Sequence, residues 1–153
     1  MTKFDETDRK LLAMLQEDSK KTNKEYANKL GLSITAIYER IKRLEKSDVI
    51  TNYVALVDKK KVNKAFVVLC HVKLIQHIKD NVLQFEREIL KLEEIAECYH
   101  VSGDYDYILK IHVEDMEAYR GFMVSKLTAI ANIGSTQSTF IINEVKHTTA
   151  IDV

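Results

Sequence analysis

Basic and polar side chains recur at helical spacing between residues 34 and 46, in the segment ITAIYERIKRLEK. On a helix that turns by about 100° per residue, they gather on one side, opposite an apolar stripe. The stripe contains Ile34, Ile37, Ile41 and Leu44. Cationic groups on such a helix can bind phosphate, and the polar groups among them can read base edges in the major groove of DNA. A solvated surface helix has the same pattern, so this helix alone leaves both interpretations open.

The residues before this helix predict a helix-turn-helix. Gly31 suits the tight turn, Ser33 is a good N-cap, and Thr22 with Glu25 forms a capping box at the start of the preceding helix. We predict DNA contacts for Thr22, Asn23, Ser33, Thr35, Ala36, Tyr38, Glu39, Lys42, Arg43 and Lys46. In this set, Arg43 and Lys46 are expected mostly on phosphates. Arg40 lies at the edge of the apolar stripe, where a structural role is the alternative.

A second group of polar side chains lies in the turn from His100 to Asp106. A glycine there allows backbone N–H groups to approach a carboxylate, and the neighbouring carboxylates can hold an ammonium group. Hydroxyl groups further along the chain can orient the same ligand. The predicted small-molecule site contains His100, Ser102, Gly103, Asp104, Tyr105, Asp106, Thr136 and Ser138. The alternative is a hairpin turn with ordinary surface carboxylates.

The sequence shows no catalytic constellation. The five histidines lack metal-ligand spacing, and the four glycines are scattered, so no phosphate-cradling loop is present. Cys70 and Cys98 lie in apolar runs and are predicted to be buried free thiols. We therefore expect neither enzyme activity nor a metal or cofactor.

Charge is distributed unevenly along this chain of net charge zero. Residues 1–64 carry 15 Lys and Arg against 10 Asp and Glu, whereas residues 65–153 carry 8 against 13. The basic N-terminal half is expected to bind a polyanion, and the acidic C-terminal half indicates a second, separate function. No apolar run approaches the roughly 20 residues that cross a bilayer, and the N-terminus has no apolar signal-peptide core, so we expect a cytoplasmic protein.

The hydrophobic periodicity predicts an α+β chain. Three short helices occupy residues 1–50, and the first begins after Asp5. A strand is expected at Ile50–Val57, and a charged linker follows it, so that residues 51–64 connect the two parts of the chain. Residues 65–153 then alternate between strand and helix periods in the order βαββαβ, which is typical of a ferredoxin-like sandwich. Its elements are expected at Phe66–Leu74, Asp80–Leu92, Ile95–Val101, Tyr105–Val113, from Asp115 onward, and Ser138–Val145.

The expected sheet has helices on one face only. The first strand presents Phe66, Val68, Cys70, Val72 and Leu74 to one side and Val67 and Leu69 to the other. Because both sides are apolar, we expect the helix-free face to pack against a second copy of the chain.

Seven segments, in this order and spacing, resemble the Lrp/AsnC family of feast/famine transcriptional regulators. The segments are Asp5-x-x-Asp8-Arg9-Lys10, Leu30-Gly-Leu-Ser33, Tyr38–Glu45, Val49-Ile50, Val57-Asp58, Val101–Tyr107 and Glu144–Lys146. The resemblance implies an N-terminal, winged-helix-like helix-turn-helix, a RAM effector-binding domain, and dimers that often associate into octamers. It also implies an amino-acid effector, bound between dimers near Ser102–Asp106 and Thr136–Ser138. This chain departs from the family at Ala131-Asn132-Ile133, where Pro-Gly-Val is common.

We therefore expect a dimeric regulator that inserts one helix per subunit into successive major grooves, about 34 Å apart, and responds to a small effector. Two alternatives are an architectural, nucleoid-like DNA binder without effector response and an enzyme similar to the sirohaem decarboxylase subunits. The three differ in sequence discrimination, in effector response and in tetrapyrrole binding.

Overall fold

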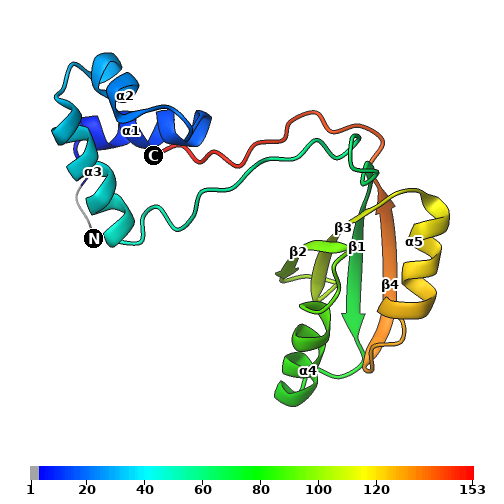
Figure 1. Ribbon diagram of the computed structural model, residues 1–153. Helices are drawn as coiled ribbons and strands as arrows, with labels where there is room; N and C mark the ends of the chain where they lie inside the picture. The colour runs from blue at the N-terminus through cyan, green and yellow to red at the C-terminus, as the bar shows by residue number, and fades with distance from the viewer. Residues whose placement is uncertain (1–3) are drawn as a thin grey trace. The chain divides into compact units, whose positions relative to one another are not determined.

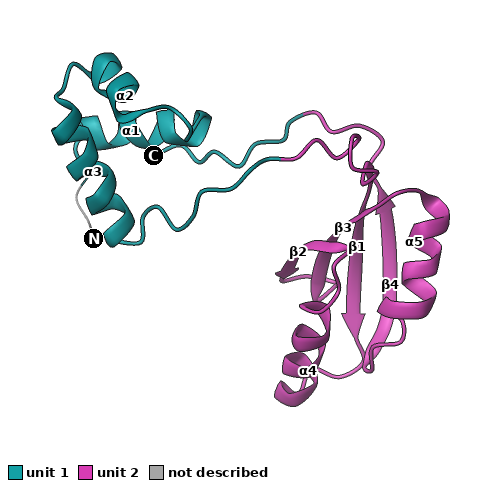
Figure 2. Cartoon of the chain, viewed as in Figure 1, with its two compact units in different colours: residues 1–56, 146–153 teal, residues 57–145 magenta. Residues whose placement is uncertain are grey.

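The chain divides into two compact units, which are seen in a computed structural model that describes residues 4–153 (Figures 1 and 2). One unit contains the N-terminal residues through Leu56 together with Lys146–Val153, and the other contains Val57–Val145. The chain therefore passes between the units twice.

The N-terminal unit is built from three helices, α1 (Glu6–Glu17), α2 (Asn23–Leu30) and α3 (Ile34–Lys46). The predicted caps are confirmed: the side chains of Asp5, Thr22 and Ser33 each accept from a backbone N–H in the first turn. Gly31 ends α2 with φ of +66°, a left-handed conformation that glycine adopts without strain.

The core of this unit is small. It contains Leu11, Leu12, Leu15, Tyr26, Ala27, Ile37 and Leu44. The apolar stripe of α3 is confirmed at its centre, where Ile37 and Leu44 are buried, but the assignment of Ile34 is wrong. Ile34 is the first residue of α3 and extends past the edge of the core, so 51% of it is exposed.

A buried carboxylate joins the first helix to the third. Asp8 is 2% exposed, and its Oδ1 accepts hydrogen bonds from Arg40 Nη1 at 2.7 Å and from Arg43 Nη2 at 2.6 Å. Arg40 Nη1 also donates to Asp5 Oδ2 at 2.7 Å. The structural role considered for Arg40 is thus seen here: it ties α3 to the N-terminus of α1.

The second unit is a four-stranded antiparallel sheet in the order β2-β3-β1-β4. Its elements are β1 (Phe66–Leu74), α4 (Lys79–Ile89), β2 (Ile95–His100), β3 (Tyr107–Val113), α5 (Met116–Phe122), a π-helical turn η1 (Met123–Leu127) and β4 (Ile133–Phe140). This arrangement confirms the predicted βαββαβ sandwich. Val68, Cys70 and Val72 of β1 share one core with Phe85 of α4 and Tyr119 of α5, so both helices cover the same face of the sheet.

Three local predictions are wrong. The last strand, expected at Ser138–Val145, lies at Ile133–Phe140 instead, because Ile133 already pairs with Leu74 of β1. Cys98 is exposed, since it lies on the edge strand β2, whereas Cys70 is buried as expected. The predicted strand at Ile50–Val57 is absent, and the described residues 51–57 form neither helix nor strand. A strand needs a neighbour to receive its backbone hydrogen bonds, and no described segment of the chain pairs with this one.

The C-terminal residues pack in the N-terminal unit. Gln16 at the end of α1 holds both backbone groups of Ile151: its Nε2 donates to the carbonyl oxygen at 2.9 Å, and its Oε1 accepts from the N–H at 2.7 Å. Among the residues that the structure describes, no helix has the length and apolar character to cross a membrane.

Replacing Asp8 with alanine should lower the free energy of unfolding of the N-terminal unit by about 1–3 kcal/mol, because the hydrogen bonds that its carboxylate accepts from Arg40, Arg43 and the Asp5 N–H would be lost. Urea unfolding of the full chain, followed by circular dichroism, measures this change. Glu6→Ala is the matched control, since the ion pair of Glu6 with Lys10 is exposed and its loss should change the stability little. Equal effects of the two substitutions would contradict this role for Asp8.

Acid should destabilise the same unit through its caps. Hydrogen bonds from the N–H of Asp8 and then from Arg40 hold the pKa of Asp5 below its usual 3.8, and the Thr22 N–H holds the pKa of Glu25 below 4.5. Groups whose pKa is lowered by folding stabilise the protein above their unfolded pKa and cease to do so as pH falls. Stability should therefore decline below about pH 5, and less steeply in Asp5→Asn/Glu25→Gln than in the control Glu17→Gln. Parallel slopes would contradict this expectation.

Candidate nucleic-acid interface and ligand site

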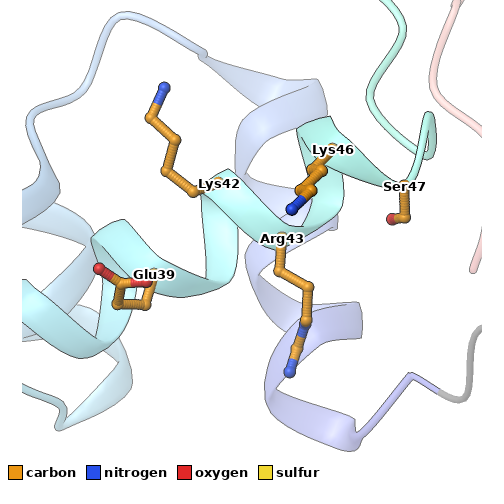
Figure 3. Close-up of a pocket in the computed structure, with 5 residues that line it drawn as sticks. All are labelled: Glu39, Lys42, Arg43, Lys46 and Ser47. Carbon is orange, nitrogen blue, oxygen red and sulfur yellow. The ribbon is translucent and has the colours of Figure 1, made fainter.

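The exposed side of α3 presents the predicted basic surface. Glu39, Lys42, Arg43, Lys46 and Ser47 line a shallow groove of about 350 Å³ (Figure 3). Tyr38, Glu39, Lys42 and Lys46 are exposed. An exposed groove on a helix, lined by three cations, is suited to the phosphates and base edges of a nucleic acid.

Lys42 is already oriented by two neighbours on its own helix. Its Nζ lies 3.2 Å from Glu45 Oε2 and 5.8 Å from the centre of the Tyr38 ring. The hydrogen bond with Glu45 raises the pKa of Lys42, so the ammonium group stays charged. Glu45 Oε1 also accepts from the Tyr53 hydroxyl at 3.1 Å, which links α3 to the segment that follows it.

Arg43 points toward α1 in Figure 3, where its Nη2 donates to both oxygens of Asp8 at 2.6 and 2.7 Å. About half of the side chain remains exposed. Arg43 therefore has a structural partner that sequence reasoning missed, because Asp8 lies 35 residues earlier in the chain.

The predicted hydroxyl groups at the helix starts have local partners. Ser33 Oγ accepts from the Ala36 N–H at 3.1 Å, and Thr22 Oγ1 donates to Glu25 Oε2 at 2.8 Å. Thr22, Ser33 and Thr35 are exposed, while Asn23 and Ala36 are half-buried. These positions all lie on α2, on α3 or at their caps.

Asp106 is the most firmly held residue of the predicted ligand turn. Its Oδ2 accepts from the Leu74 N–H at 2.7 Å, and its backbone bonds both to Val72 and to Val101. Gly103, at the tip of the turn, has φ of +136°, a backbone conformation that side chains rarely adopt. Ser102 and Asp104 are exposed beside it.

The other predicted ligand residues divide between the two faces of the sheet. Thr136 and Ser138 lie opposite Val72 and Cys70, on the helix-covered face, and Ser138 Oγ forms a 2.6 Å hydrogen bond with the Tyr119 hydroxyl. His100 stacks on the Tyr107 ring, with the ring centres 4.6 Å apart. This face therefore brings His100, Thr136 and Ser138 to the same side of the sheet.

Tyr105 points elsewhere. Its hydroxyl donates to Gln137 Oε1 at 2.7 Å, and its ring lies 5.4 Å from that of His71, a β1 residue paired with Gln137. His71 and Gln137 lie on the helix-free face. Gln137 was missed in the sequence, although its position between Thr136 and Ser138 in a strand places it on the opposite face.

Comparison with known proteins gives consistent results for both units. Residues 4–51 match a family model described as winged helix-turn-helix DNA-binding, and residues 67–151 match the Lrp/AsnC ligand binding domain. The leucine-responsive regulatory protein of Escherichia coli is 37% identical over 143 residues, which are 94% of this chain and 87% of that protein.

Solved structures give the same result over the whole chain. A Neisseria meningitidis transcriptional regulator in complex with L-Met superposes with a TM-score of 0.93 at 31% identity, over 97% of this chain and 96% of that one. An AsnC family regulator from Agrobacterium tumefaciens has a TM-score of 0.93 at 35% identity over the same shares.

Asp106→Ala should lower the free energy of unfolding by about 1–3 kcal/mol, because the buried N–H of Leu74 would lose its acceptor. Asp106→Asn keeps an acceptor oxygen and should lose less. Thermal unfolding of the full chain measures both, with Asp104→Ala as the control on the exposed side of the turn. An Asp106→Ala protein as stable as the control would show that Asp106 does not hold the turn.

Proposed function

This chain belongs to the Lrp/AsnC family of DNA-binding transcriptional regulators, and we propose that it reads specific DNA sites and responds to an amino acid. DNA binding is assigned to residues 1–50, and effector binding and assembly to residues 65–153, joined by residues 51–64. The observation that carries the proposal is the exposed, three-cation groove on the second helix of a winged helix-turn-helix.

We assign the proposed DNA contacts from the exposure of each side chain and from the hydrogen-bond donors that it still has available. Thr35, Tyr38, Glu39 and Lys42 are exposed along α3 and are assigned to base edges. Lys46 is assigned to phosphate. Arg43 is also assigned to phosphate. Its Nη2 contacts the Asp8 carboxylate, and its other N–H donors are available for the phosphate. Thr22, Asn23, Ser33 and Ala36 complete the surface at the helix N-termini, where the backbone favours an anion.

We propose a homodimer formed through the helix-free face of the sheet. This face carries the partly exposed Leu69 and Ile108 beside a 2.9 Å ion pair between Lys110 and Glu97. A face that mixes apolar surface with paired charges suits a self-complementary contact. Association of dimers into octamers is the proposed larger assembly.

We propose an amino acid as the effector, bound at His100, Ser102–Asp106, Thr136 and Ser138. The Asp104 and Asp106 carboxylates suit its ammonium group, and the open backbone at Gly103 suits its carboxylate. Support comes from the L-Met complex of the Neisseria regulator and from the leucine-responsive name of the curated relative.

DNA reading is tested on duplexes that the protein selects from a random-sequence pool. A sequence-specific regulator should bind the selected duplex at least about 1,000-fold more tightly than a scrambled one, whereas an architectural binder should discriminate little. Lys42→Ala should weaken the selected complex about tenfold and leave scrambled DNA less affected. Lys10→Ala on α1 is the control. Equal affinities of all three proteins would contradict the assignment of α3.

Effector binding is tested by thermal unfolding with each of the twenty standard amino acids, with the assembly size followed by light scattering. Stabilisation by one or a few of them is expected, because a ligand that binds only the folded state raises its stability. Ser102→Ala/Thr136→Val should reduce this stabilisation, and Thr139→Val on the helix-free side of β4 should keep it. No shift with any amino acid would favour a regulator or architectural protein without such an effector.

A further inference from the structure

A histidine from outside the predicted turn lies against its central carboxylate. His77 belongs to the loop between β1 and α4, and its Nδ1 is 3.2 Å from Asp106 Oδ1. Asp106 is largely covered, with 16% of its side chain exposed, whereas 59% of the His77 side chain is exposed. His77 is therefore placed where a ligand would approach Asp106 from solvent.

The two carboxylate oxygens of Asp106 have different partners. Oδ2 accepts the Leu74 N–H at 2.7 Å and is occupied by the fold. Oδ1 is the atom that faces His77. A cation that binds Asp106 at Oδ1 therefore meets the imidazole at the same atom.

Asn132 fixes the loop that carries His77. Its Oδ1 accepts from the Gln76 N–H at 3.1 Å, its Nδ2 donates to the Gln76 carbonyl at 2.9 Å, and its own carbonyl accepts from the Ile75 N–H at 2.9 Å. Asn132 has φ of +70°, which asparagine tolerates better than most residues. The residue next to His77 is thus held on both of its backbone groups.

We propose that His77 modulates the affinity of the effector site: its protonated ring occupies Asp106 Oδ1 in place of the effector's ammonium group, and Asn132 positions it there. This inference rests on the proposed effector site. Imidazoles gain and lose a proton between about pH 5 and 8, whereas the ammonium group of an amino acid stays charged over that range. Competition for Oδ1 is therefore stronger in acid, and effector affinity rises with pH.

The charged groups near His77 are few. Asp106 is its one ion-pair partner within the described part of the chain. Lys79 and Asp80 follow it at the start of α4 and carry opposite charges, and Asp104 shares the turn with Asp106. Asn132 and Ile133, on the β4 side, are neutral. Asp106 is thus the group whose pairing changes when His77 is protonated.

The test is a thermal-shift titration of the full chain with the twenty standard amino acids, at about pH 6 and about pH 8. Exposed ion pairs of this kind change affinities by a small factor, so the apparent affinity of the wild-type protein should be about threefold higher at the upper pH. His77→Gln should bind equally at both pH values. The control His147→Gln, in the C-terminal segment, should keep the wild-type difference.

Asn132→Gly tests the positioning role. Glycine accepts the positive φ, so the backbone keeps its conformation while the two side-chain hydrogen bonds to Gln76 are lost. The pH difference should shrink toward that of His77→Gln. Binding that does not change with pH in the wild-type protein, or that changes equally in His77→Gln, would overturn the role of His77 and leave the effector site in place. No binding by any variant would overturn the effector site, and this inference with it.

Discussion

A buried carboxylate is the constraint on which the N-terminal unit depends. Asp8 has little access to water, so it must be compensated by other charges, and the two arginines that do so both come from α3, the helix to which we assign DNA reading. A charge in this position favours one alignment of α1 against α3, because a shifted helix would leave Asp8 unpaired at a cost of several kcal/mol. The surface that we propose for DNA contact thus takes its orientation from a contact on its inner side.

In the second unit, successive side chains of a strand point alternately to the two faces of the sheet, so the two faces present different residues. Residues of β1 and β4 that point to the helices form the core and include Thr136 and Ser138. Their neighbours along each strand, which include Gln137 and Leu69, point to the helix-free face. Asp106 lies between the two, where the β2–β3 turn bonds to β1. The face proposed for assembly and the turn proposed for ligand binding are therefore neighbours, and Tyr105 of the turn contacts Gln137 on that face.

Local signals made most of the fold predictable from sequence. Helix caps at Asp5, Thr22 and Ser33 depend on residues three positions apart, and β1 was predicted to the residue because its apolar alternation is uninterrupted. Contacts between distant residues left no such signal. The bonds of Asp8 with Arg43 and of Asn132 with Gln76 join positions 35 and 56 residues apart. Residues 51–57 have strand-forming side chains, but no segment among residues 4–153 pairs with them, and composition cannot supply a partner.

The return of the C-terminal residues to the N-terminal unit has a mechanical consequence. A domain on a single linker can rotate through any number of turns, because rotation about the single bonds of one linker meets little resistance. Here the chain crosses between the units twice, and Gln16 holds the second crossing at Ile151. While that contact holds, a full rotation would wind the two crossings around each other. The two connections therefore limit how far the helix-turn-helix can rotate about the linkers.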